Sequence, residues 1–444
     1  MTGANALRPL VRIAWRNVGR HWRHSLGAAL SIVVGFVAIG LFEGYLHDLE
    51  VIQRDWYIHR GMLGHVVIEQ RGASGREGRE DPWRFSLHGR EQAFIDGYLR
   101  THSSQVATRV RVLQLGGLAT TGRAGVMFYA WGVDVREAAA LRGEWAWNVT
   151  AGRPLHEGQE NAVIIGTGLG SLLDCTGPAP AGAIGPDGKP KKVVRPLSCR
   201  QNFVQLSSTT EHGQLNVIDP SIVGLFDAGL KDVDTRFAQL PLPLAQQLAD
   251  TESVTFYAVL LEDESQSPAF IEGLRQSAAQ SGLELDIAAW VDHPFAELYR
   301  RTDSILAVYR NLVVLIVVTI AGMSVLTTML KSVNERIREI GTLRSLGFRR
   351  RHILVLFSAE SALLALGSSL VGFLATVAIA RLINGANLSY DGGVATTPIP
   401  LTVSVVPAAC VFAVAFLSGV AVLAALLPAR RASRLGIPDA LGHV

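Results

Sequence analysis

Glycine- and lysine-bearing loops are the first places where this sequence could hold a nucleotide. A phosphate-binding loop needs Gly-x4-Gly-Lys-Ser/Thr, so that backbone N–H groups and a lysine surround the phosphates. The nearest match, Gly185-Pro-Asp-Gly-Lys-Pro, has the wrong glycine spacing and ends in Pro190. Gly166-Thr-Gly-Leu-Gly follows the apolar run Ala162–Ile165 but lacks the Gly-x-Gly-x-x-Gly spacing of dinucleotide sites. It predicts a tight turn from strand to helix.

Motifs for hydrolysis or metal binding are also missing from the 444 residues. There is no His-Glu-x-x-His or Gly-x-Ser-x-Gly, and the 12 histidines are scattered. We therefore expect no catalytic residue, no metal site and no cofactor bound by this chain. We also expect no nucleic-acid partner.

The cysteines offer one redox feature. Cys175 and Cys199 flank Thr176–Ser198, a stretch rich in Pro, Gly and Lys that is typical of an exposed loop. In an oxidising compartment the pair could close this loop as a disulfide, and two free thiols are the alternative. Cys410 lies in an apolar segment, where a small packing role is expected.

The elements that would carry these residues are mainly membrane helices. The sequence is 49% hydrophobic and only 18% charged, a composition that favours a membrane protein. About 20 apolar residues are needed to cross a bilayer. Four segments meet this length: Leu26–Leu46, Leu312–Leu330, Ile353–Ile383 and Leu401–Leu427. The helix that contains the second segment is expected to begin earlier, near residue 304.

The basic residues predict the orientation of these spans. Lys and Arg in short loops are retained on the cytoplasmic side. They cluster before the first span, between the second and third, and after the fourth, at Arg8, Arg12, Arg16, Arg20, Arg23, Lys331, Arg336, Arg338, Arg344, Arg349, Arg350, Arg351, Arg430, Arg431 and Arg434. The loop 384–400 has none. Both termini, the loop 331–352 and the tail 428–444 are thus expected in the cytoplasm, and residues 47–303 outside it.

The N-terminal segment 1–25 predicts an amphipathic helix at the cytoplasmic face of the membrane. A cleaved signal peptide fits poorly, because more than 20 residues precede the apolar run and His47-Asp48-Leu49-Glu50 offers no small-residue cleavage site. Arginines and apolar residues form two neighbouring stripes. We expect Arg12, Trp15, Arg16 and Trp22 to contact head groups and the acyl boundary. Packing of the same stripe on other protein is the alternative.

The loop 331–352 predicts a short charged helix. Val333, Ile337 and Ile340 fall on one face, and Gly347 sits where a helix would be capped. Such a helix could enter a groove on a soluble partner, or simply connect two spans as a solvated helix. Glu360, just inside the third span, is expected to reach water or arginines such as Arg351.

Two further features concern packing. Glu43 is expected to lie at the outer end of the first span with a solvated head group. Small residues that would permit close helix approach, within one chain or between chains, are Gly27, Gly35, Gly40, Gly367 and Gly372.

Residues 47–303 predict a mixed α/β domain of two subdomains, about 47–145 and 146–303. Predicted strands and helices alternate along it. The strands are Gly64–Gln70, Val106–Leu115, Val126–Gly132, Ala162–Ile165, Phe203–Ser207, Ile222–Phe226 and Val254–Leu261, and the helices are Glu91–Arg100, Leu244–Ala249 and Pro268–Ser281.

Three segments resemble the permeases of the MacB, FtsX and lipoprotein-releasing superfamily of ABC transporters. They are Glu335-Arg-Ile-Arg-Glu-Ile-Gly-Thr-Leu-Arg-Ser-Leu-Gly-Phe, Glu360-Ser-Ala-Leu-Leu-Ala-Leu-Gly followed by Gly372, and Pro428-Ala-Arg-Arg-Ala-Ser-Arg-Leu-Gly-Ile-Pro-Asp-Ala-Leu. The one-plus-three arrangement of spans matches as well. The segment from Ile222 to Leu248 looks most like the lipoprotein-releasing permeases of the LolC and LolE type.

The resemblance implies a type VII, MacB-like permease of the bacterial inner membrane. A coupling helix after the second span would dock on a separate ATPase dimer that uses ATP and Mg. It would place at this contact Glu335, Arg336, Glu339, Ile340, Gly341, Leu343, Leu346 and Gly347. A second permease chain, identical or a paralogue, and the lipid bilayer complete the expected partners.

The same resemblance leaves the cargo open. The main expectation is extrusion of lipoprotein or lipid-like substrate, helped by a periplasmic carrier or adaptor at a hairpin near Thr210–Asn216. That turn is short, and the Cys175–Cys199 loop departs from the family pattern, which leaves carrier binding open. The alternatives are MacB-like efflux of periplasmic peptides or small molecules, and FtsX-like signalling to a cell-wall hydrolase.

Overall fold

The fold was analysed in a computed structural model that describes residues 12–17, 19–20, 22–122, 125–176 and 196–434. The chain divides into two compact units. The helical unit comprises residues 1–50, 303–388 and 401–444, and the α/β unit comprises residues 51–302 and 389–400. Each unit is described by itself.

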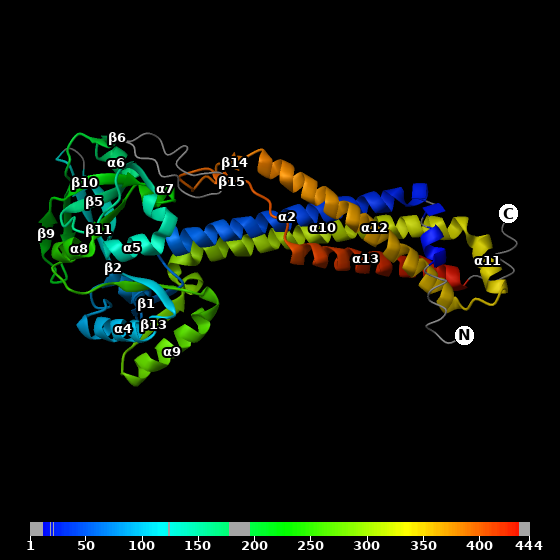
Figure 1. Cartoon of the computed structure of the whole chain (residues 1–444), viewed down its shortest axis with the longest axis horizontal. Helices are drawn as coiled ribbons and strands as arrows, with labels where there is room; N and C mark the ends of the chain where they lie inside the picture. The colour runs from blue at the N-terminus through cyan, green and yellow to red at the C-terminus, as the bar shows by residue number, and fades with distance from the viewer. Residues whose placement is uncertain (1–11, 18, 21, 123–124, 177–195, 435–444) are drawn as a thin grey trace. The chain divides into compact units, whose positions relative to one another are not determined.

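Four long helices build the helical unit and run side by side (Figure 1). All four are long and apolar enough to cross a membrane. They are α2 (Trp22–Asp55), α10 (Glu297–Glu335), α12 (Arg350–Gly385) and α13 (Pro407–Arg434), and the shorter α11 (Ile337–Ser345) joins α10 to α12. Each predicted apolar span lies within one of them, with one difference at the start of the fourth.

The fourth helix begins six residues later than its apolar segment. Residues 401–406 are not helical, and α13 starts at Pro407. The segment Leu401-Thr-Val-Ser-Val-Val is rich in β-branched residues, which lose rotamer freedom in a helix. Proline favours the first helical turn, where its missing N–H costs nothing. Hydropathy therefore located the span but not its first turn.

Glycines let the helices of this unit approach closely. A Cβ atom on Gly35 would lie 2.7 Å from a Val317 methyl carbon, and one on Gly372 would lie 2.8 Å from the Phe36 Cβ atom. Gly40 is similarly tight against Thr376. These three glycines thus pack within one chain. A Cβ on Gly27 or Gly367 would meet nothing within 4 Å.

One large mixed sheet forms the centre of the α/β unit. Its order is β13-β1-β12-β2-β3-β11-β5-β10-β4, with β8 pairing β2 and β9 pairing β8. The β11–β3 and β10–β5 pairs are parallel, and the other pairs are antiparallel. The strands are β1 (Val66–Gln70), β2 (Val106–Thr120), β3 (Gly125–Val133), β4 (Val149–Gly152), β5 (Ala162–Gly166), β8 (Gln205–Thr209), β9 (Leu215–Ile218), β10 (Ser221–Phe226), β11 (Phe237–Pro241), β12 (Phe256–Leu261) and β13 (Leu285–Ala289).

Short helices and two small strand pairs complete this unit. The helices are α3 (Arg76–Glu80), α4 (Gly89–Thr101), α5 (Val135–Arg142), α6 (Thr167–Leu172), α7 (Lys231–Asp234), α8 (Leu242–Ala249) and α9 (Ser267–Gln280), and a π-helical turn covers Trp56–Arg60. β6 (Cys175–Thr176) pairs with β7 (Ser198–Cys199), and β14 (Ser389–Tyr390) pairs with β15 (Ile399–Pro400).

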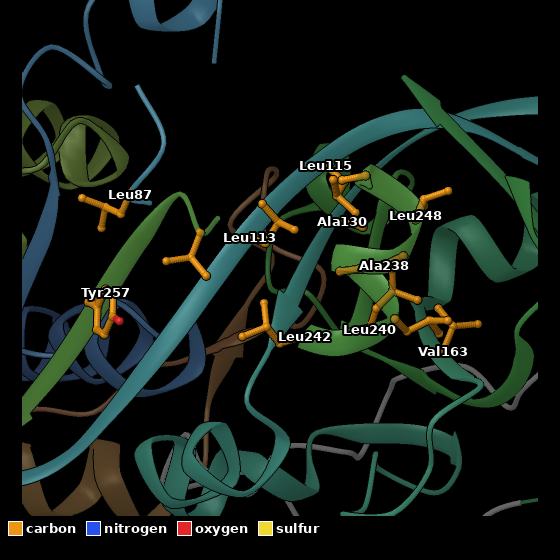
Figure 2. Packing of buried hydrophobic residues seen from close by; sticks show 14 of the residues in the cluster. Leu87, Leu113, Leu115, Ala130, Val163, Ala238, Leu240, Leu242, Leu248 and Tyr257 are labelled. Atoms are coloured by element: carbon orange, nitrogen blue, oxygen red, sulfur yellow. The ribbon is translucent and has the colours of Figure 1, made fainter. Parts of the chain in front are cut away.

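The sheet buries both faces, and neighbouring residues along a strand point to opposite sides. In β12, Tyr257 and Val259 join one core while Phe256 and Ala258 join the other. The first core packs against α4, α8 and α9, and Figure 2 shows part of it, with Leu113, Leu242 and Leu248 among the labelled residues. Because both faces are covered, strands such as β5 read as continuous apolar runs.

One continuous sheet includes strands from both sides of residue 145, where a boundary between two subdomains was expected. β12 and β13, which come late in the chain, pair with β1, and β12 also pairs with β2. The chain leaves this end of the sheet after β3 and returns to it after α8. A single boundary in the sequence therefore does not separate the strands at the two ends of the sheet.

Most predicted strands and helices of the α/β unit are confirmed within a few residues. The turn after Gly166 connects β5 to α6, as its glycines predicted. The expected hairpin near Thr210–Asn216 is formed by β8 and β9, whose turn is closed by the Thr210 N–H donating to the Gln214 carbonyl. The strands β11 and β13 were not predicted.

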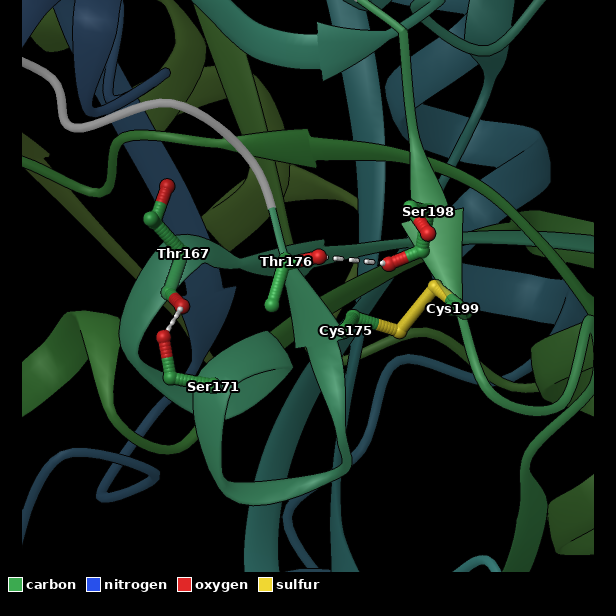
Figure 3. Close-up of a disulfide and its surroundings, with 6 residues drawn as sticks. All are labelled: Thr167, Ser171, Cys175, Thr176, Ser198 and Cys199. Carbon is green, nitrogen blue, oxygen red and sulfur yellow. Dashed lines mark hydrogen bonds between the residues drawn. A yellow bond between two sulfur atoms is a disulfide. The ribbon is translucent and has the colours of Figure 1, made fainter.

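Cys175 and Cys199 form a disulfide between β6 and β7 (Figure 3). The Thr176 hydroxyl donates to the Ser198 carbonyl beside it. The two strands are the ends of the loop Thr176–Ser198, of which residues 177–195 lie outside the described residues. The bridge therefore joins segments 24 residues apart at the edge of the buried core, where Cys175 is 1% exposed.

Removing the disulfide should destabilise the α/β unit. A bridge that closes a loop of this length restricts the unfolded chain, so Cys175→Ser should lower its free energy of unfolding by about 2–4 kcal/mol. Denaturant unfolding of the full chain, with and without reductant, measures this effect. Cys410→Ala, a change at a free cysteine of α13, is the matched control. Free thiols at both positions in mass spectra of unreduced protein would contradict the bridge.

Candidate functional site

The loop that joins α10 to α12 carries the strongest sequence signal, and it folds as the short helix α11. α10 ends at Glu335, and Arg336 breaks the helix with φ −112° and ψ 17° before α11 begins at Ile337. The first helical hydrogen bond of α11 runs from the Ile340 N–H to the Arg336 carbonyl, at 2.9 Å. The predicted helix is thus present.

One face of α11 holds the helix to its own chain. Ile340 is 3% exposed and shares a core with residues of α2, α10, α12 and α13. Gly341 is also buried, and Leu343 and Phe348 pack partly against the same core. Because this face is already covered, Ile340 and Gly341 are placed to hold the helix rather than to meet a partner.

Arg336 and Glu360 form a buried ion pair that anchors the start of α11 to α12. The Arg336 Nη1 atom lies 2.9 Å from Glu360 Oε1 and 3.3 Å from Oε2. The side chains are each only 6% exposed. Glu360 reaches an arginine, as expected, but its partner is Arg336, in the break between α10 and α11, rather than Arg351. A buried pair of this kind is costly to break, because the remaining charge loses its partner in an apolar environment.

Gly347 ends α11 in the way its sequence position predicted. Its φ is +93°, in the left-handed region that favours glycine. The Gly347 N–H donates to the Arg344 carbonyl, and the Phe348 N–H donates to the Leu343 carbonyl. These two bonds make a Schellman cap, and Phe348 and Leu343 pack partly against the same core.

Replacing Gly347 by alanine should destabilise this cap. A Cβ atom there would meet nothing within 4 Å, so the cost is that of the left-handed backbone alone, about 1–2 kcal/mol. Thermal unfolding of the full chain in detergent measures it. Gly367→Ala is the control, because it also has open space but lies inside helix α12 and should be neutral or slightly stabilising. Equal effects of the two changes would contradict this assignment.

The opposite face of α11 is exposed and mixed in character. We call it the α11 surface, and its residues are Arg338, Glu339, Thr342, Ser345 and Leu346. Leu346 is 72% exposed and is the one large apolar side chain of this surface. Glu335 and Gly347 are exposed as well. Of the eight residues expected to meet an ATPase, Arg336, Ile340 and Gly341 are therefore buried, Leu343 is partly buried, and the remaining four are accessible.

The N-terminal segment is helical over residues 12–17. The residues of its apolar stripe and of its arginine stripe differ in exposure. Ala14 is fully buried and packs with Leu356, with Ile13 and Leu363 partly buried around them. Arg12, Trp15 and Arg16 are exposed, Trp15 at 68%. The exposed residues remain free to meet a membrane, while Ile13 and Ala14 pack on protein. The first eleven residues and the Trp22 side chain lie outside the described residues.

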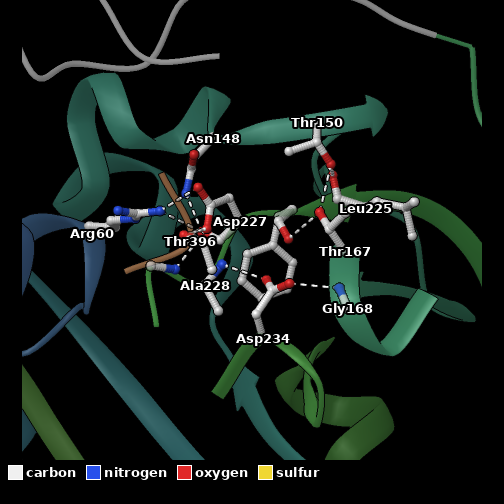
Figure 4. Close-up of polar contacts among 12 residues, drawn as sticks. Arg60, Asn148, Thr150, Thr167, Gly168, Leu225, Asp227, Ala228, Asp234 and Thr396 are labelled. Carbon is white, nitrogen blue, oxygen red and sulfur yellow. Dashed lines mark hydrogen bonds and ion pairs between the residues drawn. The ribbon is translucent and has the colours of Figure 1, made fainter. Parts of the chain in front are cut away.

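A buried polar cluster in the α/β unit was not predicted (Figure 4). The Arg60 Nη2 atom lies 2.8 Å from Asp227 Oδ2, with the two side chains 5% and 1% exposed. The Asn148 side chain donates to the Asp227 carbonyl, and the Thr396 hydroxyl donates to the Asp227 carboxylate. This cluster ties the segment 389–400 to the sheet. Its members come from four distant parts of the chain, so no local pattern could indicate it.

A second acid lies beside this cluster. Asp234 accepts hydrogen bonds from the N–H groups of Ala228 (2.9 Å) and Gly168 (2.6 Å). Burial raises the pKa of Asp234 above its ordinary value, and those two bonds oppose the rise. Within the part of the chain that the structure describes, no three His, Cys, Asp or Glu residues are grouped so that they could hold a metal ion.

Comparison with known proteins places the α11 region in a family context. Residues 311–437, from the middle of α10 to just beyond the end of α13, match the family described as FtsX-like permease C-terminal. A pyoverdine export ATP-binding/permease protein, PvdT of Pseudomonas entomophila, is 30% identical over 192 residues, which is 43% of this chain and 27% of PvdT. An uncharacterized ABC transporter permease of Bacillus subtilis, YvrN, is 37% identical over 119 residues, 27% of this chain and 26% of YvrN.

A macrolide export ATP-binding/permease protein, MacB of Wolinella succinogenes, is 31% identical over 135 residues, 30% of this chain and 19% of MacB. The matched part of the chain thus spans about a fifth to a quarter of these relatives' length. Among solved structures, the periplasmic region of MacB from Actinobacillus actinomycetemcomitans aligns over 55% of this chain and 95% of that one, with 12% identity and a TM-score of 0.34. None of these findings supports the closer resemblance to lipoprotein-releasing permeases that the segment after Ile222 suggested.

Proposed function

We propose that these residues form the permease part of a MacB-like ABC exporter in a bacterial inner membrane. An ATPase docks on the α11 surface from the cytoplasm, and the α/β unit lies on the other side of the membrane. The observation that carries this proposal is the family match over residues 311–437, which contains the whole of α11. The exposed Leu346 among charged neighbours supports it, because such a surface suits a groove on a soluble partner.

The chemistry of the cycle lies outside this chain. ATP and Mg bind to the ATPase, and closure of the ATPase dimer moves α11. The buried Arg336–Glu360 pair passes that movement to α12, because it joins the start of α11 to a membrane helix without a solvent gap. A second permease chain faces the first across the membrane. Both termini lie in the cytoplasm, as the basic residues predict.

Export of soluble amphipathic molecules is the cargo class we favour over lipoprotein extrusion. The relatives PvdT and MacB are named for pyoverdine and macrolide export. The short turn between β8 and β9 also gives little surface for recruiting a carrier. Signalling to a cell-wall hydrolase without cargo is the second candidate, since the FtsX-like match fits it equally well.

Reconstitution separates these functions. The full chain should be purified from its native membranes with the ATPase that accompanies it and placed in lipid nanodiscs. We expect a macrolide or an amphipathic peptide to stimulate ATP hydrolysis about twofold or more, and a triacylated lipoprotein to have no effect. Stimulation by the lipoprotein alone would overturn the cargo class. Hydrolysis unchanged by every cargo, with a hydrolase as the only stimulator, would favour signalling.

A further inference from the structure

A small pocket in the α/β unit lies apart from the α11 surface. It has a volume of about 130 Å³ and is lined by apolar side chains of α5, of β5 and of the loop after β4, among them Val135, Ala138, Ile164 and Leu155. Three polar side chains, Arg142, His156 and Gln239, also line it. Ala138, Leu155, Ile164 and Gln239 are buried, so the pocket reaches into the second core of the sheet.

Arg142 brings a half-buried guanidinium with one unpartnered N–H group to this pocket. Its Nε atom is buried without a hydrogen-bond partner, and among the described residues its side chain forms no ion pair with an acid. Its guanidinium carbon lies 5.8 Å from the centre of the Phe226 ring. Burial and the charge of Arg60 lower the pKa of Arg142 to about 10, which leaves it charged at neutral pH. Arg60 itself is paired with Asp227.

Gln239 brings an unused acceptor to the same pocket. The side chain extends from β11 and is 3% exposed, yet its Oε1 atom accepts no hydrogen bond. A buried amide oxygen without a donor is costly, as is a buried N–H group, here that of Arg142 Nε, without an acceptor. The two groups cannot be relieved by one simple anion, because the guanidinium needs an acceptor and the amide oxygen needs a donor.

We infer that this pocket binds a carboxylate with an adjacent N–H group and a small apolar side chain, such as the C-terminal residue of a peptide or an N-acylated amino acid. The carboxylate accepts hydrogen bonds from Arg142, and the N–H donates to Gln239 Oε1. The side chain fills the apolar lining formed by Val135, Ala138 and Ile164.

The pocket's size limits the side chain. A cavity of about 150 Å³ holds one benzene molecule, so this one has room for a single residue with a side chain such as that of valine or alanine. Larger residues would displace buried atoms of the second core, which costs more than the added contacts supply. The pocket therefore selects by size as well as by charge.

Calorimetric titration of the full chain in nanodiscs tests this inference. The probes are N-acetyl-L-valine, its neutral relative N-acetyl-L-valinamide, and a tripeptide ending in valine. We expect N-acetyl-L-valine to bind and the valinamide to bind about tenfold or more weakly, because it lacks the charge-assisted bond to Arg142. Equal affinities of the tripeptide and N-acetyl-L-valine would indicate that the pocket recognises only the terminal residue. Binding of the tripeptide alone assigns the site to peptides.

Matched variants connect the binding to the pocket. Arg142→Met keeps the apolar stem and should weaken N-acetyl-L-valine binding about tenfold or more. Arg153→Met, at an exposed arginine outside the lining, should leave it unchanged. Gln239→Leu, checked for folding by thermal denaturation, should weaken the acylated residue more than isovalerate, which has no N–H. Absence of binding by all three probes, or equal binding to the wild type and the Arg142→Met variant, would overturn the inference.

Discussion

Replacing Glu360 by alanine is expected to lower the stability of the helical unit by about 3–5 kcal/mol, because Arg336 then keeps a buried charge without a partner. Both side chains of the Arg336–Glu360 pair are buried, each 6% exposed. Denaturant unfolding of the full chain in mixed micelles measures the change. In the proposed function the same variant should also reduce coupled ATP hydrolysis, because the start of α11 is no longer held to α12.

Two controls separate the buried pair from a general effect of charge removal. The ion pair between Lys331 and Glu335 is exposed, with side chains 62% and 42% accessible, so Lys331→Ala should cost less than about 1 kcal/mol. The double variant Arg336→Met with Glu360→Met removes both charges and should recover most of the stability. If Glu360→Ala costs no more than Lys331→Ala, the pair does not anchor α11.

The variant Leu346→Asp should weaken binding of the ATPase at least about tenfold while leaving the fold intact. Leu346 is 72% exposed, so its replacement leaves no cavity in the chain. A hot-spot side chain at the centre of an interface contributes about 2 kcal/mol or more to binding, and the α11 surface offers Leu346 as its one large apolar side chain. The dissociation constant between the ATPase and the nanodisc-bound chain measures the effect, with thermal unfolding as the check on folding.

Leu388→Asp is the matched control for this prediction. Leu388 is 50% exposed and follows the other end of α12, in the segment expected on the outer side of the membrane. Its replacement should leave ATPase binding unchanged. Equal loss of binding for both variants would indicate a general defect, and no loss for Leu346→Asp would remove the α11 surface as the docking site.

Local patterns were enough to predict the helices and the end of α11. The apolar runs are long enough to define four spans without tertiary information, and Gly347 follows a short amphipathic helix at the position where a left-handed residue ends it. The disulfide was also within reach of sequence reasoning, because Cys175 and Cys199 flank one loop. In each case the signal lies within a few dozen consecutive residues.

Long-range partners could not be predicted in the same way. Arg336 was expected at an ATPase contact because its segment resembles the coupling helix of the permease superfamily, but the direction of its side chain depends on Glu360, 24 residues later. The cluster around Asp227 draws on residues from Arg60 to Thr396. The unpredicted strand Phe237–Pro241 is buried along its whole length and contains Gln239, so it lacks the alternation that marks a half-exposed strand.

Site-specific photo-crosslinking in living cells tests the central claim most directly. A photoreactive amino acid would be placed at Glu339, Thr342 or Leu346 on the α11 surface, and at Leu388 as the control. The proposed function predicts crosslinks from the three α11 positions to an ATP-binding protein or domain, and none from Leu388. Crosslinks to lipid alone from the α11 positions, or equal crosslinking to the ATPase from Leu388, would contradict the claim that an ATPase docks on this surface.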